Sequence, residues 1–207
     1  ATLASGLLPM ALGGDAASAW IALALLATAG IGWLDDHRPL RARTRLLVHL
    51  GAATLVAWAV LGMPHDGAGI AGLLLVVLLL AWSINLHNFI DGINGLLALQ
   101  GAAILGLLAW FAARAGDVGL ARVAGSAAVA CLAFVPFNLL RARIFLGDVG
   151  SGAIGLLVGA CALLAWQRDV LDAGALLMLV SAGATDASLT LMSRMQAGRR
   201  WYRPHRE

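Results

Sequence analysis

The stretch Ala68–Ile84 reads AGIAGLLLVVLLLAWSI and carries no charged side chain. A helix rises about 1.5 Å per residue, so a run of this length crosses most of the hydrocarbon core of a bilayer. Helix is the only sensible state, because an open sheet edge cannot be satisfied in lipid and the alternation of a barrel strand is missing. The stretch therefore predicts a transmembrane helix.

Similar charge-poor stretches recur along the whole chain. Hydrophobic residues make up 61% of the 207 residues and charged residues only 12%, whereas a soluble domain has roughly a quarter charged residues. We therefore predict an all-α, polytopic transmembrane helix bundle, packed closely through its many glycines and alanines. After a partial N-terminal span, we predict about seven full spans: Ser18–Leu34, Arg45–Met63, Ala68–Ile84, Gly95–Ala113, Gly119–Phe137, Gly152–Trp166 and Ala173–Leu191.

Both ends of the sequence suggest a piece of a longer protein. Ala1–Leu12 is apolar but lacks a basic leader and an initiating Met, and the chain stops at Glu207 within a basic loop. We expect residues 1–207 to form a single integral membrane domain that lacks terminal spans. Cys131 and Cys161 lie in apolar runs without metal-ligand spacing and are interpreted as buried small hydrophobes.

The arginines divide the loops into two sets. All 14 basic residues are arginine and the net charge is +3. Because arginine gathers in cytoplasmic loops, we attribute this balance to membrane orientation and expect no nucleic-acid partner. The loops expected to be cytoplasmic, separated by even numbers of spans, hold Arg38, Arg41, Arg43, Arg45, Arg141, Arg143, Arg194, Arg199, Arg200, Arg203 and Arg206; the opposite loops hold Arg114 and Arg168, with Arg122 just inside a span.

Two adjacent carboxylates, Asp35 and Asp36, follow the first full span. Ionisable groups at a membrane edge are expensive to desolvate, and this makes them functional candidates. The alternative is a solvated helix end.

The second cytoplasmic loop, Asn85–Leu96, gathers many polar side chains. Asn85, Asn88 and Asp91 recur every three residues, near one helical face. Amide and carboxylate oxygens are hard ligands that suit Mg²⁺. A polar helix cap followed by a glycine turn is the alternative. We assign no role to His87 in this loop.

The third loop reads RARIFLGDVGSG over residues 141–152 and places Asp148 among glycines before a span. Gly147, Gly150 and Ser151 are expected to offer backbone N–H groups to a phosphate at the start of that helix, with Asp148 holding a bridging cation. A glycine-rich helix start with an Asp N-cap is the alternative.

The fourth loop, Arg199–Arg206, is rich in arginine, whose guanidinium can bind phosphate. It could equally anchor the chain beside anionic lipid. Acids collect divalent metal and arginines collect phosphate, so the four loops together indicate a metal-dependent reaction of phosphate esters at one membrane surface.

These motifs resemble, in order, those of the polyprenyl-phosphate N-acetylhexosamine-1-phosphate transferases. That family includes the phospho-MurNAc-pentapeptide translocase and the enzymes that start O-antigen, teichoic acid and enterobacterial common antigen synthesis. The resemblance runs from about Ile31 to Glu207, and the second and third motifs are the most specific. The matches are Leu34-Asp35-Asp36, Asn88-Phe89-Ile90-Asp91-Gly92, Phe145-Leu146-Gly147-Asp148-Val149-Gly150-Ser151 and the basic loop ending in Pro204-His205.

The resemblance implies transfer of a sugar-1-phosphate from a UDP-sugar to polyprenyl (undecaprenyl) phosphate, with release of UMP. It implies Mg²⁺, with Mn²⁺ as a substitute, and an active site on the cytoplasmic face of the inner (plasma) membrane. Direct attack by the lipid phosphate, kept deprotonated by Asp35, is favoured over a covalent Asp intermediate. By position, the catalytic residues would be Asp35, Asp36 and Asp91, the metal ligands Asn88 and Asp148, and the substrate-binding residues Asn85, Asn94, Arg203 and His205.

Two positions depart from the family pattern. Asn94 stands where many members carry a second Asp, and only His205 represents the His cluster of many relatives. The ending Trp201–Glu207 favours the O-antigen type of enzyme. The sugar, the polyprenol length and the oligomeric state, a homodimer included, stay open.

Two other classes of function compete with the enzyme. A transporter or lipid flippase also uses intramembrane acids, but it usually places them near the midplane, whereas these acids gather at span ends. A non-catalytic membrane scaffold would not need all four acids.

Overall fold

Six long helices dominate the part of the chain that the structure describes. The computed structural model describes residues 16–139 and 144–181. Each of the six helices is long and apolar enough to cross a membrane, which confirms the predicted all-α, polytopic bundle. They are α2 (Ala16–His37), α3 (Ala42–Leu61), α4 (Gly67–Ile90), α5 (Leu96–Arg114), α6 (Val118–Asn138) and α7 (Gly147–Gln167).

The remaining predicted spans are described in part or not at all. Residues 173–181 are helical and begin the predicted span Ala173–Leu191. The rest of that span and the partial span Ala1–Leu12 lie outside the described residues.

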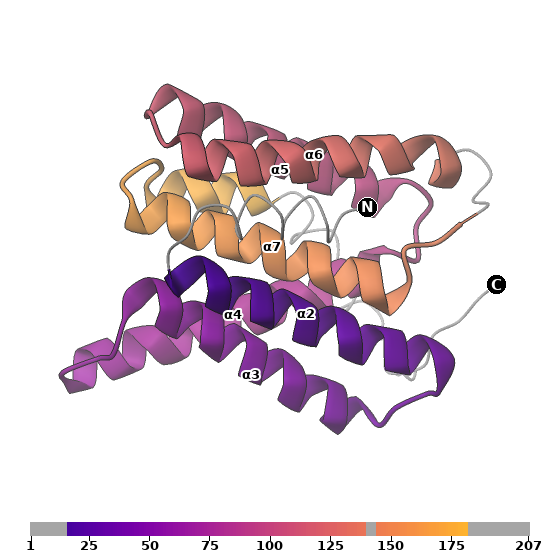
Figure 1. Ribbon diagram of the computed structural model, residues 1–207, viewed down its shortest axis with the longest axis horizontal. Helices are drawn as coiled ribbons and strands as arrows, with labels where there is room; N and C mark the ends of the chain where they lie inside the picture. Colours follow the sequence, from indigo (N-terminus) through magenta and orange to yellow (C-terminus); the bar gives the residue numbers. More distant parts are fainter. Residues whose placement is uncertain (1–15, 140–143, 182–207) are drawn as a thin grey trace.

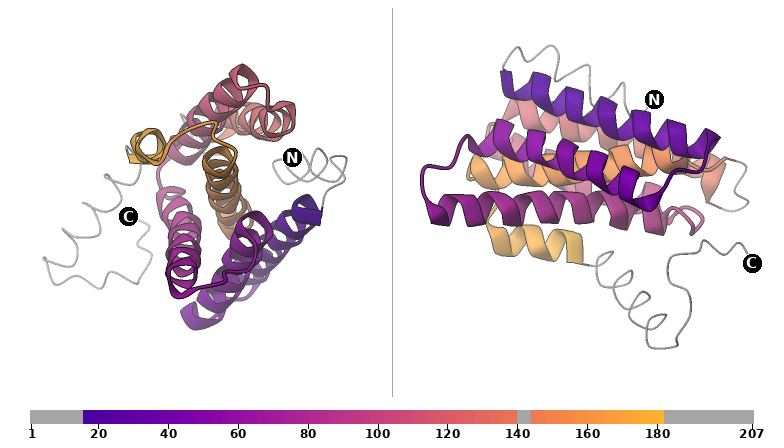
Figure 2. Two further views of the ribbon diagram at one scale, coloured as in Figure 1. Left: turned by 90° about the vertical axis from the view of Figure 1, so that its left-hand side faces the viewer. Right: turned by 90° about the horizontal axis from the view of Figure 1, so that it is seen from below.

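Helix α7 is the centre of the bundle. It contacts each of the other five helices, with α2, α3 and α4 on one side and the α5–α6 pair on the other (Figures 1 and 2). In its most apolar window 72% of the residues are buried, compared with 22% for α4. Small residues line α7, and they allow its neighbours to approach closely.

The contact between α4 and α7 shows how close this approach is. A Cβ atom on Gly155 would lie 2.7 Å from the carbonyl oxygen of Ser83 and 2.8 Å from the Cα of Ile84. The Ser83 hydroxyl donates a hydrogen bond of 2.8 Å to the carbonyl of Gly155. A glycine and a hydroxyl thus lock the two helices together where lipid offers no hydrogen-bonding partner.

Helix α4 also presents a face of leucines to the outside. Leu74, Leu75, Leu78 and Leu79 are all more than half exposed. Such a continuous apolar surface is a liability in water, but in a bilayer it is the surface that lipid covers. The exposed leucines therefore agree with a membrane span.

Four helices run past the predicted ends by three residues or more, and α3 is one of them, because it begins at Ala42 rather than at Arg45. The predicted spans ended at Leu34 and Ile84, whereas α2 continues to His37 and α4 to Ile90. Helix α7 begins at Gly147 rather than at Gly152. The prediction of a loop from Asn85 onward was therefore wrong as far as Ile90. An apolar run measures only the part of a helix in hydrocarbon, and polar turns extend it beyond.

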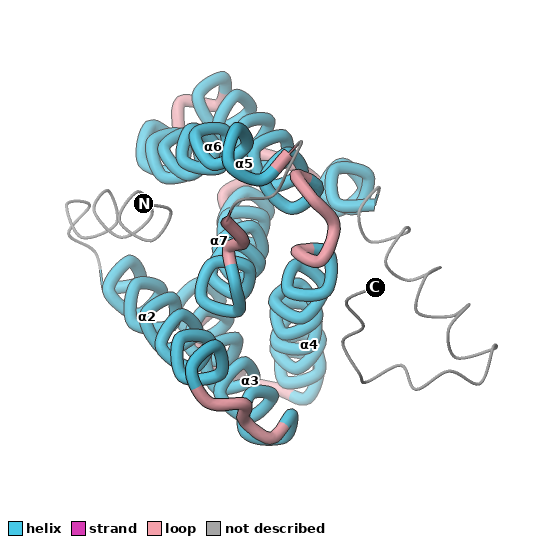
Figure 3. The backbone as a smooth tube through the Cα atoms, turned by 90° about the vertical axis from the view of Figure 1, so that its right-hand side faces the viewer, coloured by secondary structure: helices cyan, strands magenta, loops and turns pink. Residues whose placement is uncertain are grey.

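The motif-bearing connections meet at one end of the bundle. Figure 3 looks onto this end, where the α2–α3 and α4–α5 connections lie around the start of α7. For the described residues, this confirms the prediction that these segments share one face of the bundle.

A matched pair of glycines on α2 tests the central packing. A Cβ atom on Gly32 would overlap the backbone carbonyl group of Asp148, whereas one on Gly30 meets nothing within 4 Å. We expect Gly32→Ala to lower the stability by about 1–3 kcal/mol through overpacking, and Gly30→Ala to change it by at most about 1 kcal/mol in the stabilising direction. Thermal unfolding in detergent measures both, and equal melting temperatures would contradict the packing of α2 on α7.

Candidate active site

The two adjacent acids at the end of α2 point to different partners. Asp35 accepts hydrogen bonds of 2.6 Å from the backbone N–H of Leu40 and from Nη1 of Arg45. Asp36 accepts from the backbone N–H groups of Asp148, at 3.1 Å, and Val149, at 3.4 Å. Asp35 therefore belongs to a charged cluster, whereas Asp36 caps the first turn of α7.

The start of α7 depends on a glycine and on carboxylates from two other segments. Gly147 has a φ of 65°, and a Cβ atom there would lie 2.6 Å from Oδ2 of Asp36. The carboxyl of Asp91, which follows α4, interacts with the backbone N–H of Gly147. Negative groups at a helix N-terminus satisfy its free N–H groups and its dipole.

This arrangement corrects one prediction about the third motif. The backbone N–H groups of Gly147, Gly150 and Ser151 were expected to bind a substrate phosphate. The N–H of Gly147 instead faces Asp91, and that of Gly150 donates to the Leu146 carbonyl at 3.2 Å. The alternative of an N-cap by Asp148 is also wrong, because Leu146 holds the N-cap position and Asp148 lies in the first turn.

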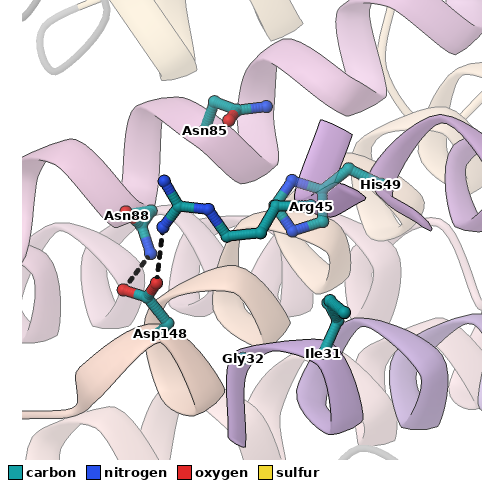
Figure 4. A pocket seen from close by; sticks show the side chains of 7 residues that line it. All are labelled: Ile31, Gly32, Arg45, His49, Asn85, Asn88 and Asp148. Atoms are coloured by element: carbon teal, nitrogen blue, oxygen red, sulfur yellow. Dashed lines mark hydrogen bonds and ion pairs between the residues drawn. The ribbon is translucent and has the colours of Figure 1, made fainter. Parts of the chain in front are cut away.

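Asp148 receives a donor on each of its carboxylate oxygens. Nδ2 of Asn88 donates to Oδ1 at 2.7 Å, and Nη1 of Arg45 donates to Oδ2 at 2.9 Å (Figure 4). Asn88 also donates to the Ser151 hydroxyl at 3.1 Å. Since the same Arg45 nitrogen contacts Asp35, one guanidinium bridges the motifs of α2 and α7.

A small cavity adjoins this bridge. Its volume is about 30 Å³, which suffices for an ion or a few waters but not for a nucleotide sugar. Nδ1 of His49 is buried without a hydrogen-bond partner in the described part of the chain. An orphaned polar atom in a cavity wall favours a polar occupant. The lining residues are Ile31, Gly32, Arg45, His49, Asn85, Asn88 and Asp148.

The residues around the cavity fit a hard divalent cation. The carboxylates of Asp35 and Asp148, the Asn88 amide and the Ser151 hydroxyl are oxygen donors of the kind that Mg²⁺ takes. Among the described residues no group of three or more His, Cys, Asp and Glu could hold a metal ion. Mg²⁺ commonly uses only one or two carboxylates and completes its coordination with water and substrate phosphate, so two acids are sufficient.

The other predicted site residues lie at different distances from this cluster. Asn85 lines the cavity, but its Nδ2 donates to the carbonyl of Ala81 in its own helix at 2.7 Å. Asn94 is exposed in the α4–α5 turn, and within the described residues no hydrogen bond joins it to the cluster. Arg203 and His205 lie outside the described residues, so their roles stay predictions.

Three further residues were not recognised from the sequence. Arg45 was counted with the orienting arginines, and His49 was not singled out. Their spacing of four residues on α3, which places both on one face of a helix, is the signal that could have found them. Asn138 is 2% exposed; it accepts from the Gly95 N–H at 2.6 Å and donates to the Ile144 carbonyl at 2.9 Å. It thereby ties the α4–α5 turn to the segment before α7.

The six spans and this cluster define a multi-pass membrane protein with an acid- and amide-lined site at one end of its bundle. The chain belongs to glycosyl transferase family 4, because the model of that family matches it over residues 18–166. The match covers α2 to α7 almost completely, and it confirms the family resemblance read from the motifs.

Individual relatives agree with this membership. The chain is 35% identical over 206 residues to decaprenyl-phosphate N-acetylglucosaminephosphotransferase of Mycolicibacterium smegmatis, covering 82% of this chain and 50% of that protein. It is 34% identical to the protein of the same name from Mycobacterium tuberculosis, with coverages of 84% and 51%. A phospho-N-acetylmuramoyl-pentapeptide-transferase of Synechococcus sp. is 35% identical, with coverages of 86% and 60%. The chain thus spans about half the length of the first relatives.

The carboxyl of Asp91 is expected to make the stability of the folded protein depend on pH. Burial raises its pKa to about 6, the N–H of Gly147 opposes this, and the charges of Asp148 and Asp36 raise the pKa further. In the folded protein the carboxyl of Asp91 therefore stays protonated at pH values above its pKa in the unfolded chain. As a result, the contribution of Asp91 to the free energy of unfolding falls as the pH rises from about 4 to about 6. We expect Asp91→Asn to remove this fall, so that its melting temperature relative to the unmodified protein increases between pH 4 and pH 7. Unfolding in detergent with EDTA measures the difference, and a constant difference would contradict the raised pKa.

Two substitutions of Asp36 test its role as a cap for α7. Asp36→Ala leaves the N–H groups of Asp148 and Val149 without their acceptor, so we expect a loss of about 0.5–2 kcal/mol. Asp36→Asn keeps one acceptor oxygen and should retain most of that stability. Chemical unfolding in mixed micelles compares the two, and equal losses would contradict capping as the reason.

Proposed function

We propose that this chain carries the active site of an enzyme that transfers a sugar-1-phosphate from a UDP-sugar to polyprenyl phosphate and releases UMP. The observation that carries the proposal is the meeting of Asp35, Asn88 and Asp148, from three distant motifs, at one end of a membrane bundle. The names of the relatives, a decaprenyl-phosphate N-acetylglucosaminephosphotransferase and a phospho-N-acetylmuramoyl-pentapeptide-transferase, support an N-acetylhexosamine donor and a polyprenyl-phosphate acceptor.

The position of the site suits a reaction between a water-soluble donor and a lipid. The tail of the acceptor can lie along the apolar helices while its phosphate reaches the end of the bundle. A bond forms between an acceptor phosphate oxygen and the sugar-bound phosphorus. The bond from that phosphorus to the oxygen of UMP breaks, and the electron pair leaves with UMP.

Asp148 and Asn88, with Asp35 alongside, are the residues that would hold Mg²⁺, for which Mn²⁺ can substitute. The cation, when bound, neutralises charge on the donor diphosphate so that the anionic acceptor can approach. Asp36 and Asp91 hold the first turn of α7 and thereby fix Asp148. Because the cavity is too small for the nucleotide and sugar, these groups bind outside it, where Asn94, Arg203 and His205 are predicted to contact substrate.

We favour direct attack by the lipid phosphate over a covalent intermediate. A covalent route needs a carboxylate that is free to act as a nucleophile. In the described part of the chain each of the four motif acids already has a partner: a guanidinium, an amide or a backbone N–H. Direct attack needs these groups only to bind and position the reactants.

The arginines of the motif end support a cytoplasmic position for that end by the positive-inside rule, so the site would face the cytoplasm from the plasma membrane. A single copy of the chain supplies Asp35, Asn88 and Asp148. A homodimer would therefore not be needed to complete this cluster.

Release of UMP by the full-length protein in membranes tests the proposal. The assay supplies polyprenyl phosphate, Mg²⁺ and a panel of UDP-N-acetylhexosamines that includes UDP-N-acetylglucosamine and UDP-N-acetylmuramoyl-pentapeptide. We expect UMP only when lipid and Mg²⁺ are both present, and a loss of at least about 100-fold in Asp148→Ala, because it removes charge from the reacting centre. Asp117→Ala is the control, since Asp117 pairs with Arg168 at the opposite end of the bundle.

Two outcomes would count against the enzyme. The metal-dependent site would be refuted if EDTA did not reduce UMP release, or if Asp148→Ala released UMP as fast as the unmodified protein. No UMP with any donor and no binding of a UDP-sugar to the folded protein would favour the transporter or scaffold instead.

A further inference from the structure

Arg45 contacts the two oxygens that a cation at this site would use. Its Nη1 lies 2.6 Å from Oδ2 of Asp35 and 2.9 Å from Oδ2 of Asp148. Because one nitrogen touches both, the two oxygens are close enough together for a single cation to contact both. The guanidinium is thus a tethered cation within the cluster.

The second oxygen of each carboxylate is engaged as well. Asp148 accepts from the Asn88 amide at 2.7 Å, and Asp35 accepts from the Leu40 N–H at 2.6 Å. Each carboxylate oxygen has two lone pairs, so these donors alone do not exclude a cation. A cation that bridges Asp35 and Asp148, however, would take the position between their Oδ2 atoms that Nη1 of Arg45 holds. Asn88 needs only to turn its amide over to present oxygen, whereas Arg45 has no oxygen to offer.

The balance of charge also opposes the binding of a divalent cation while Arg45 still bridges Asp35 and Asp148. Asp35 and Asp148 bring at most two negative charges to the cluster, and the guanidinium of Arg45 balances one of them. A divalent cation together with Arg45 would overfill the cluster and put two positive groups within a few ångströms of each other, at a membrane edge where screening is weak.

The cavity provides space for a displaced Arg45 side chain, and its polar wall favours a polar ligand. Arg45 borders it with a side chain that is 34% exposed, so the guanidinium has room to leave the carboxylates. Figure 4 shows Arg45 reaching along the cavity to Asp148, with His49 on the same helix. His49 is 8% exposed and its Nδ1 lacks a partner among the described residues, which points to a polar occupant such as a hydrated ion.

We propose that Arg45 is the internal counter-ion of the metal site, and that its bridge between Asp35 and Asp148 and the binding of a divalent cation to these carboxylates exclude each other. The inference rests on the proposed metal site. Arg45 in this role is a positioning residue: it keeps the carboxylates together, and its release accompanies loading of the metal.

Binding of Mn²⁺ to the detergent-solubilised full-length protein, followed by electron paramagnetic resonance, tests the proposal without substrate. Arg45→Gln removes the competing charge, so we expect it to bind Mn²⁺ about 10-fold more tightly, since hydrogen bonds to charged groups contribute enough for a factor of this size. The same variant should unfold at a lower temperature in EDTA, and saturating Mn²⁺ should restore most of the loss. A merely structural arginine would lower stability without tightening metal binding.

Arg168→Gln is the matched control. Arg168 pairs with Asp117 at 2.9 Å and its side chain is 37% exposed, so it resembles Arg45 but lies at the opposite end. It should leave the affinity for Mn²⁺ unchanged. If wild-type protein binds Mn²⁺ through Asp148 but Arg45→Gln binds no more tightly, the counter-ion role is wrong and the metal site stands. If neither the unmodified protein nor Arg45→Gln binds more Mn²⁺ than Asp148→Asn does, both the proposed metal site and the counter-ion role are wrong.

A measurement on the unmodified protein covers the case that Arg45→Gln does not fold. Phenylglyoxal modifies accessible guanidinium groups, and peptide mass spectrometry reports each arginine separately. We expect Mg²⁺ to increase the rate at which Arg45 is modified by about 3-fold or more, by the release of its two hydrogen bonds, and to leave Arg168 unchanged. A rate at Arg45 that is unchanged or lower with Mg²⁺ would overturn the proposal.

Discussion

The backbone N–H groups at the start of α7 impose the constraint on which the rest of the site depends. The first turn of a helix has no internal partners for these groups, and a membrane edge makes them costly to leave unpaired. Asp36 of α2 and Asp91 after α4 supply the acceptors. Two distant segments are thus drawn to one turn, and Asp148 is held within that turn.

Close packing makes this meeting feasible. Gly32 lets α2 touch the α7 backbone at Asp148, and Gly155 lets the backbone of α4 approach α7 about two turns further along. Helix α7 is therefore the axis against which the other helices are positioned. The acids stand on helix ends of a packed bundle rather than on loops, which holds their geometry more firmly.

Once these acids are assembled, their charge has to be balanced. Arg45 provides the balance inside the chain, and it does so with a single nitrogen shared between Asp35 and Asp148. The same electrostatics that make the bridge favourable make it a competitor for any divalent cation. In the proposed metal site, the stabilising bridge and the binding of the metal would therefore compete at one residue, Arg45.

The amino-acid sequence by itself determined the membrane class, the helical state of the spans, the shared end of the motif segments and the family, because apolar length, arginine distribution and motif order are properties of the chain alone. It also singled out Asp35, Asp36, Asp91, Asn88 and Asp148. Only the tertiary structure decided that Asp36 caps α7, that the glycine N–H groups have partners within the protein, and that Arg45 belongs to the site. The physical reason is that a side chain's role depends on which group faces it, and the facing groups here lie up to 113 residues away in sequence.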